Sequence, residues 1–275
     1  MDRRQVQPRT GSDRALPPRS ADELLAIEGV TLSFGGVAAL QDVSVSVRSG
    51  CVTAIIGPNG AGKTSLFNVI SGFYRPSRGR IALAGRNILR DPAHARAQLG
   101  VARTFQNLTL FPGMSVLENI KVGAHPRLRA NLLTAALYLG RAKREEDSLA
   151  RAIDRDLLEL LDLREIRDRP VSGLPYGVQK RVDLARALVT APRLLLLDEP
   201  AAGMNAPEKA AMAGYIRRFV SERGTTVLLI DHDMELIMGL SDHVAVLNFG
   251  RVIAAGAPQA VQRDPGVIGA YLGTA

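Results

Sequence analysis

The residues with the clearest chemistry form one glycine-rich stretch that ends in a lysine and a threonine. The stretch reads Gly57-Pro58-Asn59-Gly60-Ala61-Gly62-Lys63-Thr64 and fits the spacing G-x-x-x-x-G-K-[ST]. Ser65 follows it directly. Glycines let successive backbone N–H groups turn towards one anion, and the N-terminus of a following helix adds positive potential. Lys63 would supply a positive charge for the β- and γ-phosphates of a nucleotide, and Thr64 would bind Mg²⁺. A glycine-rich turn that only caps a helix is the simpler alternative, but the full octet favours a phosphate-binding loop.

Two adjacent carboxylates form a second candidate site. Asp198 and Glu199 directly follow the apolar run 194–197, which places them at the carboxyl end of a buried strand, where open α/β sheets bind their ligands. Asp198 would hold the coordination sphere of Mg²⁺ through water, and Glu199 would polarise the water that attacks the γ-phosphate. A strand that ends in Asp-Glu can also be the start of a solvated loop, and the phosphate-binding loop favours the functional interpretation.

Both sites require a particular set of elements to position them. The apolar run 52–56 precedes the glycine-rich stretch, and apolar residues follow at helical spacing over 66–70, so strand, loop and helix are predicted in that order. The runs 194–197 and 226–230 are apolar at nearly every position, as in parallel strands that are covered on both faces. These patterns predict an α/β core with a mostly parallel sheet and flanking helices.

The rest of the chain is predicted to add two subdomains to this core. Alternating apolar residues over 24–47 indicate antiparallel strands, and the helical character of roughly 107–190 indicates an inserted α-helical subdomain. Beyond residue 230 the pattern predicts a helix over 234–240, a strand over 244–247 and two short terminal helices. One face of the insert is apolar and contains Ile153, Leu157, Leu160, Leu161 and Ile166.

Composition limits the function without deciding it. A formal charge of +8 suits nucleic acid, anionic lipid or polyphosphate, but the basic residues are scattered and lack interleaved aromatics, so nucleic acid is not expected as a partner. Cys51 is the single cysteine, which together with the lack of a signal-peptide pattern favours the cytosol. Residues 1–22 are predicted to be a disordered tail, and no apolar run is long enough for a membrane helix.

Further strings along the chain identify a family. The run Leu194-Leu195-Leu196-Leu197-Asp198-Glu199-Pro200, preceded by Tyr176-Gly177-Val178-Gln179-Lys180-Arg181, resembles the ATP-binding subunits of ABC transporters, and residues 23–275 would form that ATP-binding domain, a P-loop NTPase. The resemblance implies that Phe34 stacks on the adenine of ATP. It also implies that Gln106 senses Mg²⁺ and contacts the membrane subunits, and that His232 contacts the γ-phosphate. Glu199, His232 and Gln106 are therefore the predicted catalytic residues, and Thr64, Gln106 and Asp198 the predicted metal ligands.

The sequence departs from the family pattern at two loops. Leu174-Pro175-Tyr176-Gly177-Val178 stands where the signature is usually Leu-Ser-Gly-Gly-Gln, and Pro175 offers neither a hydroxyl nor an N–H group. The resemblance implies that this segment, through Tyr176, Gly177 and a helix start, meets the nucleotide held by a second subunit. Asn205 stands where the family commonly has aspartate, so an acceptor is kept and a charge is lost.

Within the family, residues 24–275 are most similar to the larger ATP-binding subunit of branched-chain amino acid uptake systems. Arg103-Thr104-Phe105-Gln106, Ala201-Ala202-Gly203-Met204-Asn205 and the ending Val267-Ile268-Gly269-Ala270-Tyr271-Leu272-Gly273 carry this resemblance. It implies an importer ATPase at the cytoplasmic face of the cell membrane, which pairs with an identical or paralogous second ATP-binding subunit. It also implies contact with integral membrane permease subunits and, indirectly, with a solute-binding protein.

Two alternatives stay open on the sequence. One is a hydrolysis-poor regulatory subunit that pairs with an active paralogue, as Pro175 and Asn205 would suit. The other is a soluble ABC ATPase without a transport role, although such proteins usually have tandem ATPase halves or long coiled coils. The stretch 126–143 could form an amphipathic helix facing lipid or the permease, and packing within the helical insert is the preferred interpretation.

Overall fold

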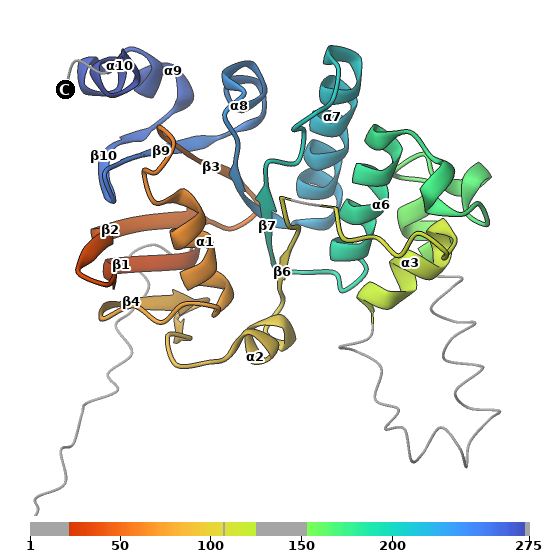
Figure 1. The fold of residues 1–275 in the computed structure, drawn as a ribbon, viewed down its shortest axis with the longest axis horizontal. Coiled ribbons are helices and arrows are strands. Elements are labelled where there is room, and N and C mark those ends of the chain that lie inside the picture. Colours follow the sequence, from red (N-terminus) through yellow and green to blue (C-terminus); the bar gives the residue numbers. More distant parts are fainter. Residues whose placement is uncertain (1–21, 107, 125–152, 273–275) are drawn as a thin grey trace, which may run out of the picture.

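The computed structural model describes residues 22–106, 108–124 and 153–272 and confirms the predicted α/β fold. Its centre is a six-stranded sheet in the order β10-β9-β3-β8-β7-β6, in which only β10 runs antiparallel to its neighbour (Figure 1). The strands of this sheet are β3 (Val52–Ile56), β6 (Val101–Arg103), β7 (Leu194–Asp198), β8 (Thr226–Ile230), β9 (His243–Asn248) and β10 (Arg251–Gly256). The four strands of this sheet that sequence patterns predicted, β3, β7, β8 and β9, are consecutive in the strand order of the sheet.

A second sheet of four antiparallel strands has the order β2-β1-β4-β5. Its strands are β1 (Glu23–Phe34), β2 (Val37–Arg48), β4 (Arg78–Leu83) and β5 (Arg86–Asn87). The predicted antiparallel region over 24–47 is thus confirmed as β1 and β2. β4, β5, β6 and β10 were not predicted, and β5 and β6 have only two and three residues, too few for a periodic signal.

Helices surround the sheets. They are α1 (Lys63–Ser71), α2 (Ala93–Gln98), α3 (Val116–Gly123), α6 (Tyr176–Leu188), α7 (Ala206–Arg223), α8 (Met234–Leu240), α9 (Pro258–Gln262) and α10 (Pro265–Leu272), with single turns at η2 (Asp154–Leu158), η3 (Arg164–Ile166) and η4 (Val171–Gly173). In Figure 1, α3 and α6 lie on the opposite side of β7 from α1. None of the helices in the described ranges is both long and apolar enough to cross a membrane.

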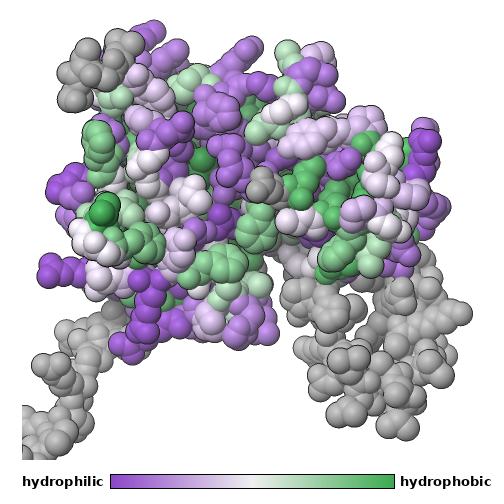
Figure 2. Space-filling view, viewed as in Figure 1, coloured by the Kyte–Doolittle hydropathy of each residue, from purple (hydrophilic) through white to green (hydrophobic). Residues whose placement is uncertain are grey.

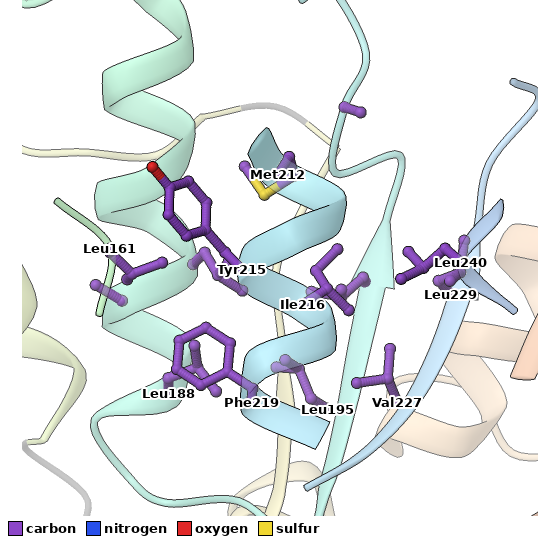
Figure 3. Close-up of a cluster of buried hydrophobic side chains, with 14 of the residues drawn as sticks. Leu161, Leu188, Leu195, Met212, Tyr215, Ile216, Phe219, Val227, Leu229 and Leu240 are labelled. Carbon is purple, nitrogen blue, oxygen red and sulfur yellow. The ribbon is translucent and has the colours of Figure 1, made fainter. Parts of the chain in front are cut away.

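The core explains why β7 and β8 are apolar at every position. Leu195, Leu197, Val227 and Leu229 belong to a buried cluster together with residues of α6, α7 and α8, whereas Leu194, Leu196, Leu228 and Ile230 belong to a second cluster together with residues of α1, β1 and β2. Because successive strand residues point to opposite faces, each strand must be apolar on both. Figure 3 shows the first cluster, where Met212, Tyr215, Ile216 and Phe219 of α7 lie between β7 and Leu188 of α6.

Parts of the sequence-based predictions fall outside this description. The stretch 126–143 and much of the expected insert over 107–190 lie outside the described residues. The expected tail over 1–22 is also outside them, except for Asp22, whose carbonyl oxygen accepts a hydrogen bond of 2.7 Å from the N–H of Ser49. Within the described part of the insert, Ile153, Leu157, Leu160 and Leu161 are buried in the first cluster, and Ile166 packs against it.

Candidate functional site

The glycine-rich loop connects β3 to α1 and is fixed by close backbone packing on both sides. Gly57 and Gly62 have positive φ angles of 149° and 103°. A Cβ atom would lie 2.0 Å from the carbonyl oxygen of Leu247 at Gly57, and 2.6 Å from that of Ala39 at Gly62. Only glycine fits such approaches, so β9 and β2 set the path of the loop.

The amino end of α1 is left open towards this loop. Gly62 is its N-cap residue and provides no side-chain hydrogen bond to the first turn of the helix. N–H groups of that turn therefore have no side-chain cap and suit an anionic ligand. Thr64 is exposed and Ser65 is half-buried at the same helix end, while Asn59 and Gly60 are exposed on the loop.

Lys63 is folded back over the loop. Its Nζ donates hydrogen bonds of 2.7 Å and 2.9 Å to the carbonyl oxygens of Gly57 and Pro58. Burial lowers the pKa of Lys63, and the negative charges of Glu199 and Asp198 act in the opposite direction. The carboxylates and the lysine are thus close enough to interact electrostatically, and a phosphate would be a better acceptor for this ammonium than two carbonyl groups.

Asp198 ends β7 and forms a buried ion pair with Arg103 at the end of the neighbouring strand β6. The Nη2 atom of Arg103 lies 2.9 Å from Oδ2 of Asp198, and the two side chains are 8% and 6% exposed. Nη1 of the same arginine donates to Oδ1 of Asn68 over 2.7 Å and to the hydroxyl of Ser71 over 3.2 Å. Arg103 therefore fixes the predicted metal ligand Asp198 against α1.

The three predicted catalytic residues converge from separate loops. Nε2 of Gln106 donates a hydrogen bond of 3.1 Å to Oε2 of Glu199, and Nδ1 of His232 lies 3.7 Å from Oε1 of the same carboxylate. Glu199 has a φ angle of +49°, in the left-handed region that non-glycine residues rarely adopt. Such backbone strain is common at active sites, where the surrounding structure maintains it.

A tight turn after β8 holds His232. Oδ1 of Asp231 accepts hydrogen bonds from the N–H groups of His232 and Asp233, over 2.8 Å and 3.0 Å. Burial raises the pKa of Asp231, and these two N–H donors oppose the shift. Asp233 caps α8 and pairs with Lys209, whose hydrogen bond lowers the pKa of the aspartate. The backbone of His232 is thus fixed while its side chain stays 71% exposed.

Phe34 ends β1 with a ring that is 47% exposed. The ring of Tyr74 meets it edge to face, with the ring centroids 5.1 Å apart. Such a pair offers an aromatic surface on which a flat base can stack. Sequence reasoning missed Tyr74 because it lies forty positions beyond Phe34 and is joined to it only by the fold.

Tyr176 and Gly177 lie apart from the phosphate loop, at the start of α6. Pro175 occupies the N-cap position of this helix, and Tyr176 is 45% exposed. Gly177 packs tightly on Glu208, since a Cβ atom there would lie 2.6 Å from its Oε1 atom. α6 lies beyond β7 from α1 (Figure 1), so within one copy of the chain these two residues lie apart from the phosphate loop.

The residues present fit a magnesium ion carried by the nucleotide. Thr64, Gln106 and Asp198 offer a hydroxyl, an amide and a carboxylate oxygen, which are hard donors of the type Mg²⁺ prefers. Among the described residues there is no cluster of three or more histidine, cysteine, aspartate or glutamate side chains that could form a complete metal cage. Mg²⁺ is typically held by one or two protein groups together with substrate phosphates.

A groove with a volume of about 970 Å³ lies beside Gln106, between α2, β6, α3 and α6. Figure 2 shows hydrophobic surface on both sides of the notch in this part of the molecule. The apolar lining consists mainly of Phe73, Phe105, Phe111 and Val122, and Asp183 and Arg186 add an ion pair. The lining thus combines aromatic and aliphatic side chains with a charged pair, and residues 57–65 of the phosphate loop do not contribute to it.

Comparisons with known proteins identify the family of the chain. The profile of the ABC transporter family matches residues 40–202, and that of the "Branched-chain amino acid ATP-binding cassette transporter" matches residues 251–275. The high-affinity branched-chain amino acid transport ATP-binding protein BraF of Pseudomonas aeruginosa is 44% identical over 252 residues, which cover 92% of this chain and 98% of BraF. The corresponding LivG protein of Escherichia coli is 41% identical over 254 residues, which cover 92% of this chain and 98% of LivG.

Solved structures give the same result for the fold. An ATP-binding cassette of an ABC transporter in its ADP conformation superposes with a TM-score of 0.80 at 32% identity, covering 91% of this chain and 99% of that one. A nucleotide-free cassette of an ABC transporter has a TM-score of 0.79, also at 32% identity, and covers 90% of this chain and 98% of its own.

Proposed function

The chain belongs to the ATP-binding subunits of ABC transporters, and we propose that Lys63, Thr64, Asp198, Glu199, Gln106 and His232 bind and hydrolyse ATP in it. One observation carries this assignment of roles: Gln106 and His232, from separate loops, both approach the carboxylate of Glu199 beside the phosphate loop. Phosphoryl transfer requires mainly positioning and charge stabilisation, which such a constellation supplies.

Each residue has a distinct role in this proposal. The N–H groups of the loop and the ammonium of Lys63 bind the β- and γ-phosphates, and the ring of Phe34 stacks on the base. Glu199 accepts a hydrogen bond from the attacking water and orients it, while Gln106 and His232 hold the carboxylate and contact the γ-phosphate. Mg²⁺, when bound, neutralises charge on the phosphates, and Thr64 and Asp198 would hold it.

The complete site requires a second copy of such a subunit. Tyr176, exposed at the start of α6, and the buried Gly177 beside it lie beyond β7 from the phosphate loop of their own chain, and this helix start would meet the nucleotide held by a partner. Two ATP molecules are then enclosed between two subunits, identical or paralogous. Closure on ATP binding and opening after hydrolysis would drive transport.

The relatives support a proposal for the transported solute and for the membrane partners. BraF and LivG are named as ATP-binding proteins of branched-chain amino acid transport, so this chain energises import of leucine, isoleucine, valine or a related small solute. The apolar groove beside Gln106 is the surface that receives the permease subunits, which hold the chain at the cytoplasmic face of the membrane, and a solute-binding protein acts indirectly through them.

The exchange Glu199→Gln tests the catalytic assignment. An amide keeps the size of the side chain but cannot act as a base, so turnover should fall by a factor of about 100 or more while ATP binding is retained. Glu222→Gln is the matched control, because Glu222 is half-exposed and pairs with Arg218 on the surface of α7. Wild-type turnover in the Glu199→Gln variant would disprove the role of Glu199.

The solute is tested separately, in proteoliposomes that contain the chain with its own membrane subunits and solute-binding protein. ATP hydrolysis should rise when leucine, isoleucine or valine is supplied. Hydrolysis that responds only to another solute would retain the ATPase assignment and overturn the solute.

A regulatory role is the second candidate, and Pro175 is the observation that favours it. This residue lacks both the hydroxyl and the N–H group at the start of α6. Strong ATP binding with negligible turnover alone, and turnover restored by a second ATPase chain, would support this role. Equal turnover in a homodimer would exclude it.

A further inference from the structure

Lys180 is a buried cation to which the mechanism above gives no task. It lies in the second turn of α6, and only 4% of it is exposed. Its Nζ atom lies 3.3 Å from the carbonyl oxygen of Glu199 and 3.4 Å from that of Gln106. One ammonium thus reaches the backbone of both the proposed catalytic carboxylate and the glutamine that donates to it.

Burying an ammonium is costly unless hydrogen bonds and charges compensate it. Here the compensation comes from two carbonyl groups, from the face of Tyr176 with its ring centroid 5.7 Å from Nζ, and from the electrostatic attraction of Asp183 one turn further along α6. A buried lysine that donates to carbonyls of two different loops joins those loops to its own helix, which an apolar side chain could not do.

The contact falls at the point where the catalytic loop is strained. Glu199 has the unusual φ angle of +49°, and its N–H group is already held by the carbonyl oxygen of Ile230 over 2.8 Å. At the other end of the residue, the carbonyl oxygen accepts hydrogen bonds from the N–H of Ala202 over 3.2 Å and from Nζ of Lys180 over 3.3 Å, and only the second ties it to α6. With both backbone groups fixed, the carboxylate of Glu199 is presented to Gln106 and His232 in one orientation.

We propose that Lys180 is a positioning residue, which ties the start of α6 to the backbone of Glu199 and Gln106 and thereby keeps the carboxylate aligned for hydrolysis. The proposal rests on the catalytic role given to Glu199 above. Lys180 does not touch the phosphate loop residues that bind ATP in that scheme, so its effect should fall on the rate of hydrolysis and leave ATP binding largely intact.

The test compares Lys180→Met, Lys180→Arg and Lys180→Gln with the wild type and with Glu199→Gln. ATP hydrolysis is measured on the full chain assembled with its membrane subunits, and ATP binding is measured on the purified chain with a fluorescent ATP analogue. Methionine keeps the length and apolar stem of lysine without the charge. Arginine retains donors for both carbonyl groups, whereas glutamine is too short to reach both.

Lys180→Met should lower kcat about tenfold or more, because misplacement of a catalytic group by a fraction of an ångström is costly, with KM and the Kd for the analogue changed by less than about twofold. Lys180→Arg should restore kcat to within about threefold of the wild type. A kcat for Lys180→Met within twofold of the wild type would overturn the proposal. So would parallel changes in kcat and KM, which indicate a general loss of structure.

If Lys180→Met does not fold, the pair Lys180→Arg and Lys180→Gln decides the matter. Near-normal kcat in the first and reduced kcat at unchanged KM in the second support the proposal, and equal kcat in both overturns it. Failure of the proposed function itself is distinguishable, because the wild type would then hydrolyse ATP no faster than Glu199→Gln.

Discussion

Replacing Arg103 with methionine should destabilise the chain strongly, because it would leave the carboxylate of Asp198 buried without its counter-charge. The two side chains are only 8% and 6% exposed, and their atoms lie 2.9 Å apart. Removing one partner of such a buried pair typically costs about 3–5 kcal/mol. A chain of this size loses about 2–4 °C of melting temperature per kcal/mol, so a decrease of about 6–20 °C is expected.

The appropriate assay is urea unfolding followed by circular dichroism, with Arg103→Met, Asp198→Asn and the double variant compared at pH 7. Asparagine carries no charge, so the double variant should recover much of the loss, with a coupling energy of about 2–3 kcal/mol between the two sites. Arg218→Met is the control, since Arg218 and Glu222 form a half-exposed pair on α7 whose loss should cost about 0.5 kcal/mol or less. A cost below about 1 kcal/mol for Arg103→Met, or additive losses in the double variant, would refute the reasoning.

Three further outcomes follow from the geometry. Gly62→Ala should raise the Kd for ATP about tenfold in a binding titration, because its Cβ atom would meet the carbonyl oxygen of Ala39. Gly60→Ala should have a smaller effect in the same titration, because no atom lies within 4 Å of the new Cβ. Phe219→Ala should lower the free energy of unfolding by about 3–5 kcal/mol, because it would open a cavity between α7, β7 and α6. Phe249→Ala should leave that free energy nearly unchanged, because the ring of Phe249 is 74% exposed. Burial raises the pKa of Asp231, so its ionisation opposes folding: stability is greatest below the unfolded-state pKa and declines as pH rises through the folded-state pKa. The difference in melting temperature between Asp231→Asn and the wild type should therefore grow in favour of the variant from pH 4 to pH 7, and a constant difference would contradict it.

The elements that the sequence predicted well are those with a complete local signal. β3, the phosphate loop and α1 are contiguous over residues 52–71, and each has its own pattern of apolar or glycine residues. β7 and β8 are five-residue strands that are buried on both faces, so their composition alone marks them. Such signals do not depend on any distant part of the chain.

The missed features are those that arise only when distant segments meet. Arg103 and Asp198 lie 95 positions apart, and the ion pair between them forms because β6 and β7 are neighbours in the sheet. The convergence of Gln106 on Glu199 spans 93 positions, and only the family resemblance indicated it. Arg103 ends β6, a strand of three residues that gives no periodic signal, so neither the strand nor its place beside β7 could be read from the sequence.

The two departures from the family pattern are well accommodated by the local structure, which limits what they can change. Asn205 caps α7, since its Oδ1 atom accepts a hydrogen bond of 3.0 Å from the N–H of Glu208 and the carboxylate of Glu208 accepts one from Asn205 in return. Aspartate would cap the helix in the same way, so asparagine removes a charge without disturbing the loop. Pro175 has a φ angle of −54°, which its ring favours, at an N-cap position whose N–H group has no partner within the helix.

Neither change therefore touches the contacts among Gln106, Glu199 and His232. If Pro175 or Asn205 lowers hydrolysis, the loss must act through the surface offered to a second subunit. A paralogous partner with serine in its own signature would restore hydrolysis at only one of the two sites. A dimer in which one of the two chains carries Glu199→Gln retains one active carboxylate. Placing the exchange first in one chain and then in the other would separate the two sites, because the remaining active carboxylate then lies opposite a different signature in each dimer.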